Sequence, residues 1–428
     1  YVPEPLTMVE GIMKLPPASF AVFQGGNLVI ERYFEPALQP LLCMHAGEIE
    51  EKTRDLIDTS VARQLISDRP LGLFLSGGLD SSIVLDAATK AAGKIETFSL
   101  RFGLEEHEQP EKLNADARIA RETAQHYGAT HHEVVFSEED FVKLLPEAVH
   151  YLDQPLGNAT AVAQYALSRF ARERIVVALA GDGGDELFGG YPRYRLSRMM
   201  DMYQRLPEVF RAPLSTVDPR LKKLNTKSAA DRIELFMFEK DVSLSRAVSS
   251  EFISSAPVTW FEERYLQGRG EADTTQLLMD ADRRSWLVDE GLERTDTMTM
   301  GASLEARVPF LDPGLIAFAS ALSTRERVGL FSNKRILRSA FRTRLPKHVL
   351  REQKRGFFSP TAKWLRRPKL LQLAREALGV GYHEGTDGLL GVEVLRMLEE
   401  HVAGTYAMNT LWTLISLRLW AHSYNMSL

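Results

Sequence analysis

A short stretch of glycine, serine and aspartate directly follows an apolar run and has the composition of a phosphate-binding turn. It comprises Ser76-Gly77-Gly78-Leu79-Asp80-Ser81-Ser82 and follows the apolar residues 71–75. Glycines let the backbone turn sharply and approach a ligand closely, and a helix that begins at Asp80 or Ser81 would direct its free N–H groups into the turn. The hydroxyls add donors, and the Asp80 carboxylate could hold a cation beside the anion. A Gly-Gly pair alone would indicate only a turn, whereas the whole pattern predicts a site for a polyphosphate and its metal ion.

A second stretch, residues 180–194 with the sequence AGDGGDELFGGYPRY, combines carboxylates with glycines after another apolar run. Asp182, Asp185 and Glu186 lie close together in it, and neighbouring carboxylates repel one another unless they share a cation. A solvated acidic turn is the alternative, which the preceding apolar strand and the four glycines disfavour. If both stretches face one crevice, Asp80 and Asp185 would hold Mg²⁺, which proteins commonly bind through carboxylates and substrate phosphates.

Alternating strands and helices must position these two stretches. The sequence predicts strands over 71–75, 95–102, 132–136 and 175–180, and helices over 48–67, 80–92, 114–127, 138–151 and 159–171. This alternation is typical of an α/β fold with a parallel, doubly wound sheet. Ligands of such sheets bind at the carboxyl ends of the strands. Ser76 and Ala180 both follow strands, so we expect their loops to share one crevice.

The regions on either side of this α/β part have different patterns. Residues 1–46 are rich in proline and hold two short strand candidates, 20–23 and 28–30, which Gly25-Gly26 would join as a hairpin. After Tyr191 the pattern is helical with short loops as far as residue 428. The chain is therefore predicted to have a small β appendage, an α/β part and a mainly helical part.

Composition excludes several classes of partner. The 428 residues are 44% hydrophobic, enough for a large core and for more than one domain. A net charge of −5 gives no electrostatic attraction to nucleic acid, and the apolar run 411–420 is too short to span a bilayer. A single cysteine, Cys43, excludes an internal disulfide and fits a cytoplasmic location. We expect small-molecule substrates and neither a nucleic-acid nor a membrane partner.

Four motifs, and in addition the N-terminal segment, resemble one enzyme family. SGGLDS resembles the pyrophosphate loop of N-type ATP pyrophosphatases, which cleave ATP between its α- and β-phosphates. GDGGDELFGGYPRY is similar to the signature of asparagine synthetases, and residues 298–312 and 334–365 look like two further segments of that family. YVPEPLTMVEGIMKLPPASF resembles the end of its glutaminase domain. Together these resemblances span nearly the whole chain in the expected order.

The resemblance implies a fold and a domain organisation. The sheet would be of the adenine-nucleotide α-hydrolase (ATP pyrophosphatase) type, followed by a mostly helical C-terminal part. Residues 1–47 would be a remnant of an N-terminal glutaminase domain with its linker. Residues 48–428 would be the synthetase domain, with a nucleotide-binding part (48–195) and a mainly helical part (196–428). The chain starts at Tyr1 without the catalytic cysteine of a glutaminase domain, which predicts a fragment or a processed product, and Cys43 is expected to be a small buried hydrophobe.

The resemblance also implies roles for single residues. Residues implied to bind ATP are Phe74, Leu75, Ser76, Gly77, Gly78, Asp80, Ser81, Leu100, Ala180 and Gly181. The implied Mg²⁺ ligands are Asp80 and Asp185. Asp182 would organise the attack of ammonia, and Lys354 would stabilise charge during adenylation. The acceptor pocket is expected to include Asn158, Thr160 and Glu186.

Some residues have simpler structural interpretations, and two segments depart from the family pattern. Glu305 and Arg307 are expected to form a structural ion pair, and the two histidines at 131 and 132 to be structural. The family commonly has serine where Ala180 stands. In residues 154–164, many members carry an acidic residue in place of Gln154, and aspartate followed by two serines in place of Asn158-Ala159-Thr160. The acceptor is therefore less defined by the sequence than the adenylation.

The resemblance implies that the chain is the synthetase part of a glutamine-dependent asparagine synthetase and catalyses ATP-dependent amide formation. Aspartate is the favoured acceptor. The resemblance also allows a homodimer. Related enzymes that act on another acid, such as β-lactam synthetases and lasso-peptide cyclases, share both loops. A tRNA-modifying ATP pyrophosphatase would be expected to show paired cysteines and basic charge. A non-catalytic relative would be expected to lack the acidic cluster.

Overall fold

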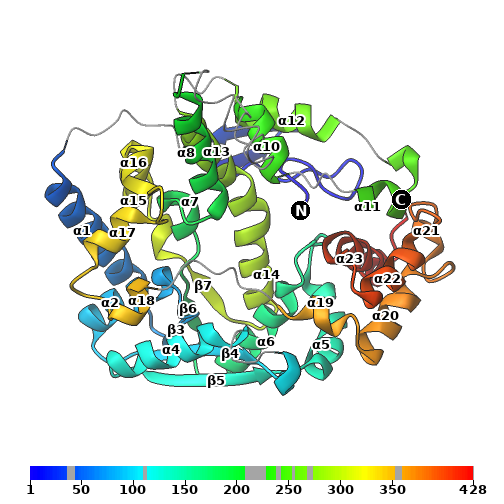
Figure 1. The fold of residues 1–428 in the computed structure, drawn as a ribbon, viewed down its shortest axis with the longest axis horizontal. Coiled ribbons are helices and arrows are strands. Elements are labelled where there is room, and N and C mark those ends of the chain that lie inside the picture. Colours follow the sequence, from blue (N-terminus) through cyan, green and yellow to red (C-terminus); the bar gives the residue numbers. More distant parts are fainter. Residues whose placement is uncertain are drawn as a thin grey trace.

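A computed structural model describes residues 1–35, 44–108, 113–207, 228–237, 242–252, 256–267, 273–351 and 359–427. Two residues considered above, Cys43 and Lys354, lie outside these ranges. Within them the chain folds into a parallel sheet with helices around it, a C-terminal group of helices and an N-terminal hairpin (Figure 1). The predicted α/β fold class is confirmed.

Five strands of the described residues form the parallel sheet, in the order β5-β4-β3-β6-β7. Their bounds are β3 (Leu71–Phe74), β4 (Glu96–Phe102), β5 (Thr130–Phe136), β6 (Val177–Leu179) and β7 (Glu305–Arg307). The first four correspond to the four predicted strands. The fifth, β7, lies in a region predicted to be helical, so the prediction was wrong there. Its three residues pair with β6, and Arg307 is tied to Glu305 by the expected ion pair at 2.6 Å.

The sheet is covered on both faces because successive strand residues point to opposite sides. Leu73 and Leu179 are register partners and pack with helices α1 (Ala46–Gln64), α2 (Leu79–Ala92) and α4 (Ala115–His126) on one side. Phe98 and Ala178 pack on the other side with Ala171 of α6 (Thr160–Arg172). The doubly wound arrangement follows from this alternation.

The remaining helices surround the carboxyl edge of the sheet or form the C-terminal group. Those before β7 are η1 (Glu106–Glu108), α5 (Glu138–Tyr151), α7 (Gly184–Phe188), α8 (Pro192–Gln204), α10 (Ala229–Met237), α11 (Val242–Ala247), η3 (Ser250–Phe252), α12 (Ala256–Tyr265), α13 (Thr274–Arg284), the π-helix η4 (Leu287–Leu292) and α14 (Glu293–Met300). Those after β7 are η5 (Pro309–Leu311), α15 (Pro313–Ala321), α16 (Thr324–Arg327), α17 (Arg335–Ala340), α18 (Lys347–Arg351), α19 (Thr361–Trp364), α20 (Pro368–Leu378), α21 (Glu384–Asp387), α22 (Val394–Ala403) and α23 (Met408–Tyr424).

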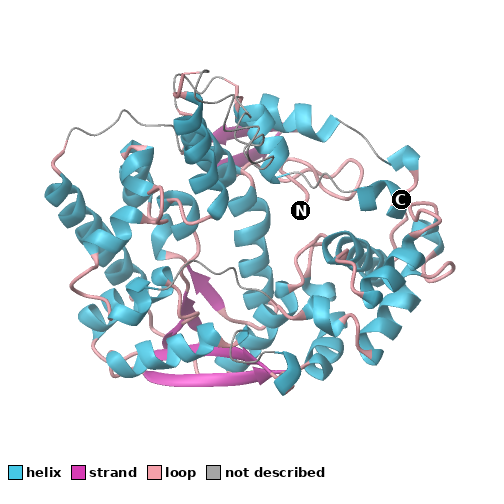
Figure 2. Ribbon diagram, in the orientation of Figure 1, coloured by secondary structure: helices cyan, strands magenta, loops and turns pink. Residues whose placement is uncertain are grey.

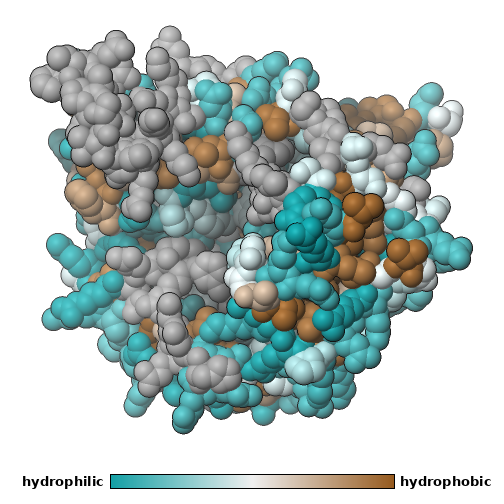
Figure 3. All heavy atoms as spheres, turned by 45° about the vertical axis from the view of Figure 1, so that its right-hand side comes forward, coloured by the Kyte–Doolittle hydropathy of each residue, from teal (hydrophilic) through white to brown (hydrophobic). Residues whose placement is uncertain are grey.

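The C-terminal helices share one core with the outer part of the sheet. Trp364 of α19 packs edge-on against Phe102, Phe136 and Phe141, and Phe141 also contacts Trp412 of α23. On the face shown in Figure 3, hydrophobic residues lie in separate groups between hydrophilic ones, which is ordinary for a protein surface. None of the helices in the described ranges is both long and apolar enough to cross a membrane.

The N-terminal hairpin stands apart from the parallel sheet (Figure 2). Strands β1 (Ser19–Gln24) and β2 (Asn27–Arg32) pair antiparallel, and Gly25 and Gly26 form the predicted turn with φ of +59° and +82°. Almost every residue of both strands is exposed, including Phe20, Phe23 and Leu28.

Candidate active site

The predicted phosphate loop connects β3 to α2 in a conformation that only glycine fits. Gly77 has φ of +76°, and a Cβ there would lie 2.3 Å from the backbone oxygen of Asp116 at the start of α4. Gly78 caps the N-terminus of α2. The Ser76 and Ser81 hydroxyls lie 3.0 Å apart, and the Gly78 N–H donates to Ser76 Oγ at 3.3 Å. Hydroxyl groups and helix N–H groups therefore gather at one point, as an anion site requires.

The acidic stretch reaches the same point from the neighbouring strand. Ala180 to Gly183 follow β6, whose residues pair with those of β3. A Cβ on Gly181 would lie 3.0 Å from the Ser81 backbone nitrogen, and one on Gly184 would lie 2.7 Å from Asp80 Cγ. The two loops thus touch each other through glycines, as the prediction of a shared crevice required.

A lysine that sequence reasoning missed joins the two loops. Lys334 Nζ donates to Asp80 Oδ2 and lies 2.5 Å from Asp185 Oδ1, and its side chain is 4% exposed. It precedes α17 with φ of +54°, a left-handed conformation that non-glycine residues seldom adopt. The sequence held only a weak signal for it, because Lys334 is the first residue of a family-like segment that contains several basic residues.

The carboxylate pair has the chemistry of a Mg²⁺ site. Asp80 and Asp185 follow adjacent strands and already share one cation, the Lys334 ammonium. A Cβ on Gly190 would lie 1.7 Å from Asp185 Oδ1, so a larger residue at position 190 would clash with that carboxylate. The described residues hold no group of three or more metal-ligating side chains. Mg²⁺ commonly takes one or two carboxylates together with substrate phosphates, so this pair fits the ion.

A second polar cluster lies beside Asp182, and we call it the acceptor-side network. Its members are Asn158, Thr160, Gln164, Asp182, Glu290, Arg294 and Thr295. Thr295 Oγ1 donates to Asp182 Oδ1 at 3.5 Å and accepts from Gln164 Nε2 at 3.0 Å. Arg294 donates to the Gln164 side-chain oxygen and, at 2.8 Å, to Glu290.

Of the predicted acceptor residues, two enter this network and one does not. Asn158 Nδ2 donates to Glu290 Oε1 at 2.7 Å, and Asn158 Oδ1 accepts from Thr160 Oγ1 at 2.7 Å. Glu186 instead lies buried on α7, where it accepts from the Tyr191 hydroxyl. Burial, and next the nearby Asp185 charge, raise the pKa of Glu186 to about 8. Its surroundings therefore favour the neutral form of the Glu186 carboxyl beside the carboxylate pair.

Glu290 and Arg294 were not predicted as site residues. Their spacing of four residues in a helical region would indicate an ordinary ion pair on one helix face. The structure places Glu290 in the π-helix η4 and Arg294 in α14, so the pair faces Asn158 and Gln164. Single π-turns within helices are frequent at functional sites, but no sequence signal marks this one.

The apolar residues expected to contact ATP lie at or near strand ends. Leu75 and Ala180 directly follow β3 and β6 and are buried. Phe74 is half-buried and packs beside the Phe98 cluster. Leu100 lies within β4, two residues before its end, and is paired with Val134. His131 lies 2.9 Å from the Thr97 hydroxyl and 3.1 Å from that of Ser99, contacts that fit the structural role expected of it.

Comparison with known proteins identifies the family. The family model described as asparagine synthase matches residues 52–422, most of the chain. The chain belongs to the asparagine synthase family. The match includes both loops, the acceptor-side network and Lys334. It confirms the family expected from the four motifs.

Individual relatives cover the chain almost completely. A protein of Mycobacterium tuberculosis named "Putative asparagine synthetase (glutamine-hydrolyzing)" is 32% identical over 98% of this chain. "Asparagine synthetase (glutamine-hydrolyzing) 1" of Bacillus subtilis is 29% identical over 99% of it. The alignments take in 65% of the mycobacterial protein and 67% of the Bacillus protein, so the chain spans about two thirds of their length. A solved structure of NMN synthetase from Francisella tularensis has a TM-score of 0.22 and 14% identity over 35% of this chain, too little to carry an argument.

Proposed function

We propose that this chain catalyses ATP-dependent amide formation in two steps. An oxygen of a substrate carboxylate, aspartate being favoured, attacks the α-phosphorus of ATP, and the bond to the β-phosphate breaks to release pyrophosphate. The nitrogen of ammonia then attacks the activated carbonyl, AMP leaves, and a proton is lost as the amide forms. The observation that carries this proposal is the contact between the two loops, with Lys334 held between Asp80 and Asp185.

The phosphate loop and Lys334 would bind the polyphosphate. The Ser76 and Ser81 hydroxyls and the N-terminus of α2 offer donors, and Lys334 offers a cation that is already desolvated. Mg²⁺, held by Asp80 and Asp185, would supply charge for the phosphates. In this arrangement the protein contributes positioning and charge neutralisation rather than a covalent intermediate.

The acceptor-side network would bind an amino acid. Arg294 can pair with a carboxylate, while Glu290 and Asp182 can accept from an ammonium group. The carboxylate of an amino-acid acceptor would bind Arg294 and its ammonium group would bind Glu290. These two contacts would replace the ion pair that Arg294 and Glu290 make with each other. Asp182 would then orient the ammonia, and Lys354, outside the described residues, keeps the role in adenylation that the resemblance implies.

Two further expectations remain part of the proposal. Residues 1–47 would be the end of a glutaminase domain, which in a complete enzyme supplies ammonia from glutamine. An acceptor other than aspartate, as in β-lactam synthetases or lasso-peptide cyclases, is the second candidate. The pairing of Asn158 with Glu290 favours it, because Asn158 is one of the residues at which the sequence departs from the family pattern.

The test is pyrophosphate release by the purified chain with ATP, Mg²⁺ and ammonium, against a panel of carboxylic acids. We expect release that depends on one amino acid and yields AMP and its amide in equal amounts. Release without amide would overturn the second step, and no release with any acid would overturn the adenylation. Arg294→Lys, which keeps the charge and loses the paired geometry, should raise the KM for the acid more than that for ATP.

A further inference from the structure

The N-terminal segment, which we define as residues 1–15, is bound to α12 and to elements that hold the acceptor-side network. The Glu4 carboxylate pairs with Arg264 of α12, with Nε and Oε1 3.2 Å apart. The Met8 N–H donates to Gln154 Oε1 at 3.2 Å, four residues before Asn158. Lys14 Nζ donates to Glu293 Oε2 at 2.8 Å and lies 3.6 Å from Asp289 Oδ1.

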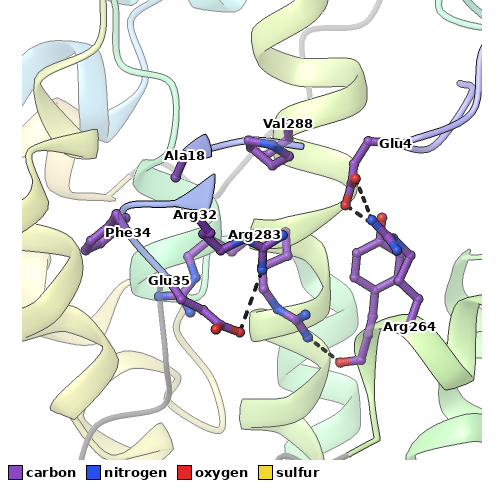
Figure 4. A pocket seen from close by; sticks show the side chains of 11 residues that line it. Glu4, Ala18, Arg32, Phe34, Glu35, Arg264, Arg283 and Val288 are labelled. Atoms are coloured by element: carbon purple, nitrogen blue, oxygen red, sulfur yellow. Dashed lines mark hydrogen bonds and ion pairs between the residues drawn. The ribbon is translucent and has the colours of Figure 1, made fainter. Parts of the chain in front are cut away.

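A pocket lies between Glu4, the region of the N-terminal hairpin and the helices α12, α13 and η4. The pocket, of about 220 Å³, has Glu4, Ala18, Arg32, Arg264, Arg283 and Val288 among its lining residues (Figure 4). Val288 belongs to the π-helix η4. The ionic contacts at Glu4 and Lys14 are two of the points at which this segment is attached.

Lys14 contacts the same helical turns that carry Glu290 and Arg294. Asp289 and Glu290 are adjacent in η4, and Glu293 and Arg294 are adjacent at the start of α14. Lys14 therefore bonds one face of these turns while Asn158 and Gln164 bond the other. Burial raises the pKa of Asp289 to about 6 even with the Lys14 charge opposing that rise. Without Lys14, Asp289 and Glu293 would lose the side-chain ammonium that lies between them.

We propose that Lys14 is a positioning residue for the acceptor site: it fixes the η4–α14 turns so that Glu290 and Arg294 face Asn158 and Gln164. The role in the acceptor site rests on the function proposed above. Lys14 itself does not touch the acceptor. It acts through the backbone that carries Glu290 and Arg294, and Gln154 fixes the facing loop through Met8 in the same way.

The test compares Lys14→Met with Lys14→Arg and with the matched control Arg246→Met. Arg246 is a cation between Glu393 and Glu400 in the C-terminal helices, at 2.6 and 3.0 Å, so its loss also breaks a double ion pair. The measurements are the KM for the acceptor acid, the KM for ATP, and backbone hydrogen exchange over residues 287–295 by mass spectrometry. Loss of a hydrogen bond to a charged group, about 1.5–3 kcal/mol, corresponds to roughly a tenfold or greater effect.

We expect Lys14→Met to raise the KM for the acid about tenfold or more with the KM for ATP within about twofold, and to speed exchange over 287–295 about tenfold. Lys14→Arg should restore both, and Arg246→Met should change neither. Unchanged exchange in Lys14→Met, or an equal rise of both KM values, would overturn the proposal. If no acid supports turnover in the wild type, the proposed function fails, and the exchange measurement still decides whether Lys14 holds these turns.

Discussion

Replacing Lys334 by methionine tests whether this lysine occupies a cation site between Asp80 and Asp185. Methionine keeps much of the side-chain length and removes the charge. The lysine side chain is 4% exposed, and each aspartate side chain is 13% exposed. The variant would leave two carboxylates facing each other in a largely desolvated place, where like charges repel strongly.

The magnitude follows from this burial. Removing one partner of a buried ion pair costs about 3–5 kcal/mol. Because the carboxylates retain some contact with water, we expect the lower end, about 3 kcal/mol. At about 2 °C per kcal/mol, the lower end for domains of 150–250 residues, the melting temperature should fall by roughly 6 °C.

The assay is thermal unfolding with EDTA and with Mg²⁺ in excess. Mg²⁺ should raise the melting temperature of Lys334→Met more than that of the wild type, because the ion binds where the ammonium was lost. The control is Lys90→Met, which removes an exposed lysine paired with Asp58 at 2.7 Å and should cost no more than about 1 kcal/mol. Equal stability of Lys334→Met and the wild type in EDTA, or an equal gain from Mg²⁺ in both, would refute the cation site.

The same site leads to three further predictions. Asp80→Asn and Asp185→Asn should each lower pyrophosphate release about a hundredfold or more at limiting Mg²⁺, and near wild-type rates would remove the metal assignment. Gly77→Ala should destabilise the fold and abolish nucleotide binding, since its Cβ would lie 2.3 Å from the Asp116 backbone oxygen; nucleotide titration and thermal unfolding check this. Since the folded-state pKa of Glu186 is raised from 4.5 to about 8, its contribution to stability is complete below pH 4.5 and is lost as the pH rises through about 8. Denaturant unfolding between pH 5 and 9 should therefore show a smaller decline for Glu186→Gln than for the wild type, and equal declines would contradict the raised pKa.

The sheet and its two loops could be predicted because their signals are local. Apolar runs of strand length alternate with helical patterns, and parallel strands bring their carboxyl ends to one edge. The strand β7 could not be predicted in this way. It is three residues long with one apolar residue, Ala306, and Arg307 holds it in place by donating to the backbone oxygens of Gln64 and Ile66 at 2.7 Å. These partners lie about 240 residues away in the sequence.

In the candidate site, too, the residues that could be predicted are those with a local signal in the sequence. Its glycines, serines and aspartates occur in two compact motifs, and their types alone indicate phosphate and metal chemistry. Glu290 lies in η4, Arg294 in α14 and Lys334 directly before α17. Their place in the site is set by contacts across more than a hundred residues of sequence. Their residue types are those of ordinary surface ion pairs, so sequence alone could not select them.

The departures from the family pattern in residues 154–164 become interpretable through their contacts. Gln154 offers its side-chain oxygen to the Met8 N–H, and a carboxylate at 154 could accept the same bond. Position 158 differs, because Asn158 both accepts from Thr160 and donates to Glu290. An aspartate there could still accept from Thr160, but it would face the Glu290 carboxylate at hydrogen-bond distance with no proton to donate. Positions 158 and 290 are therefore linked: an acid at 158 requires a neutral or basic partner at 290, and such an exchange would change the charge presented to the acceptor.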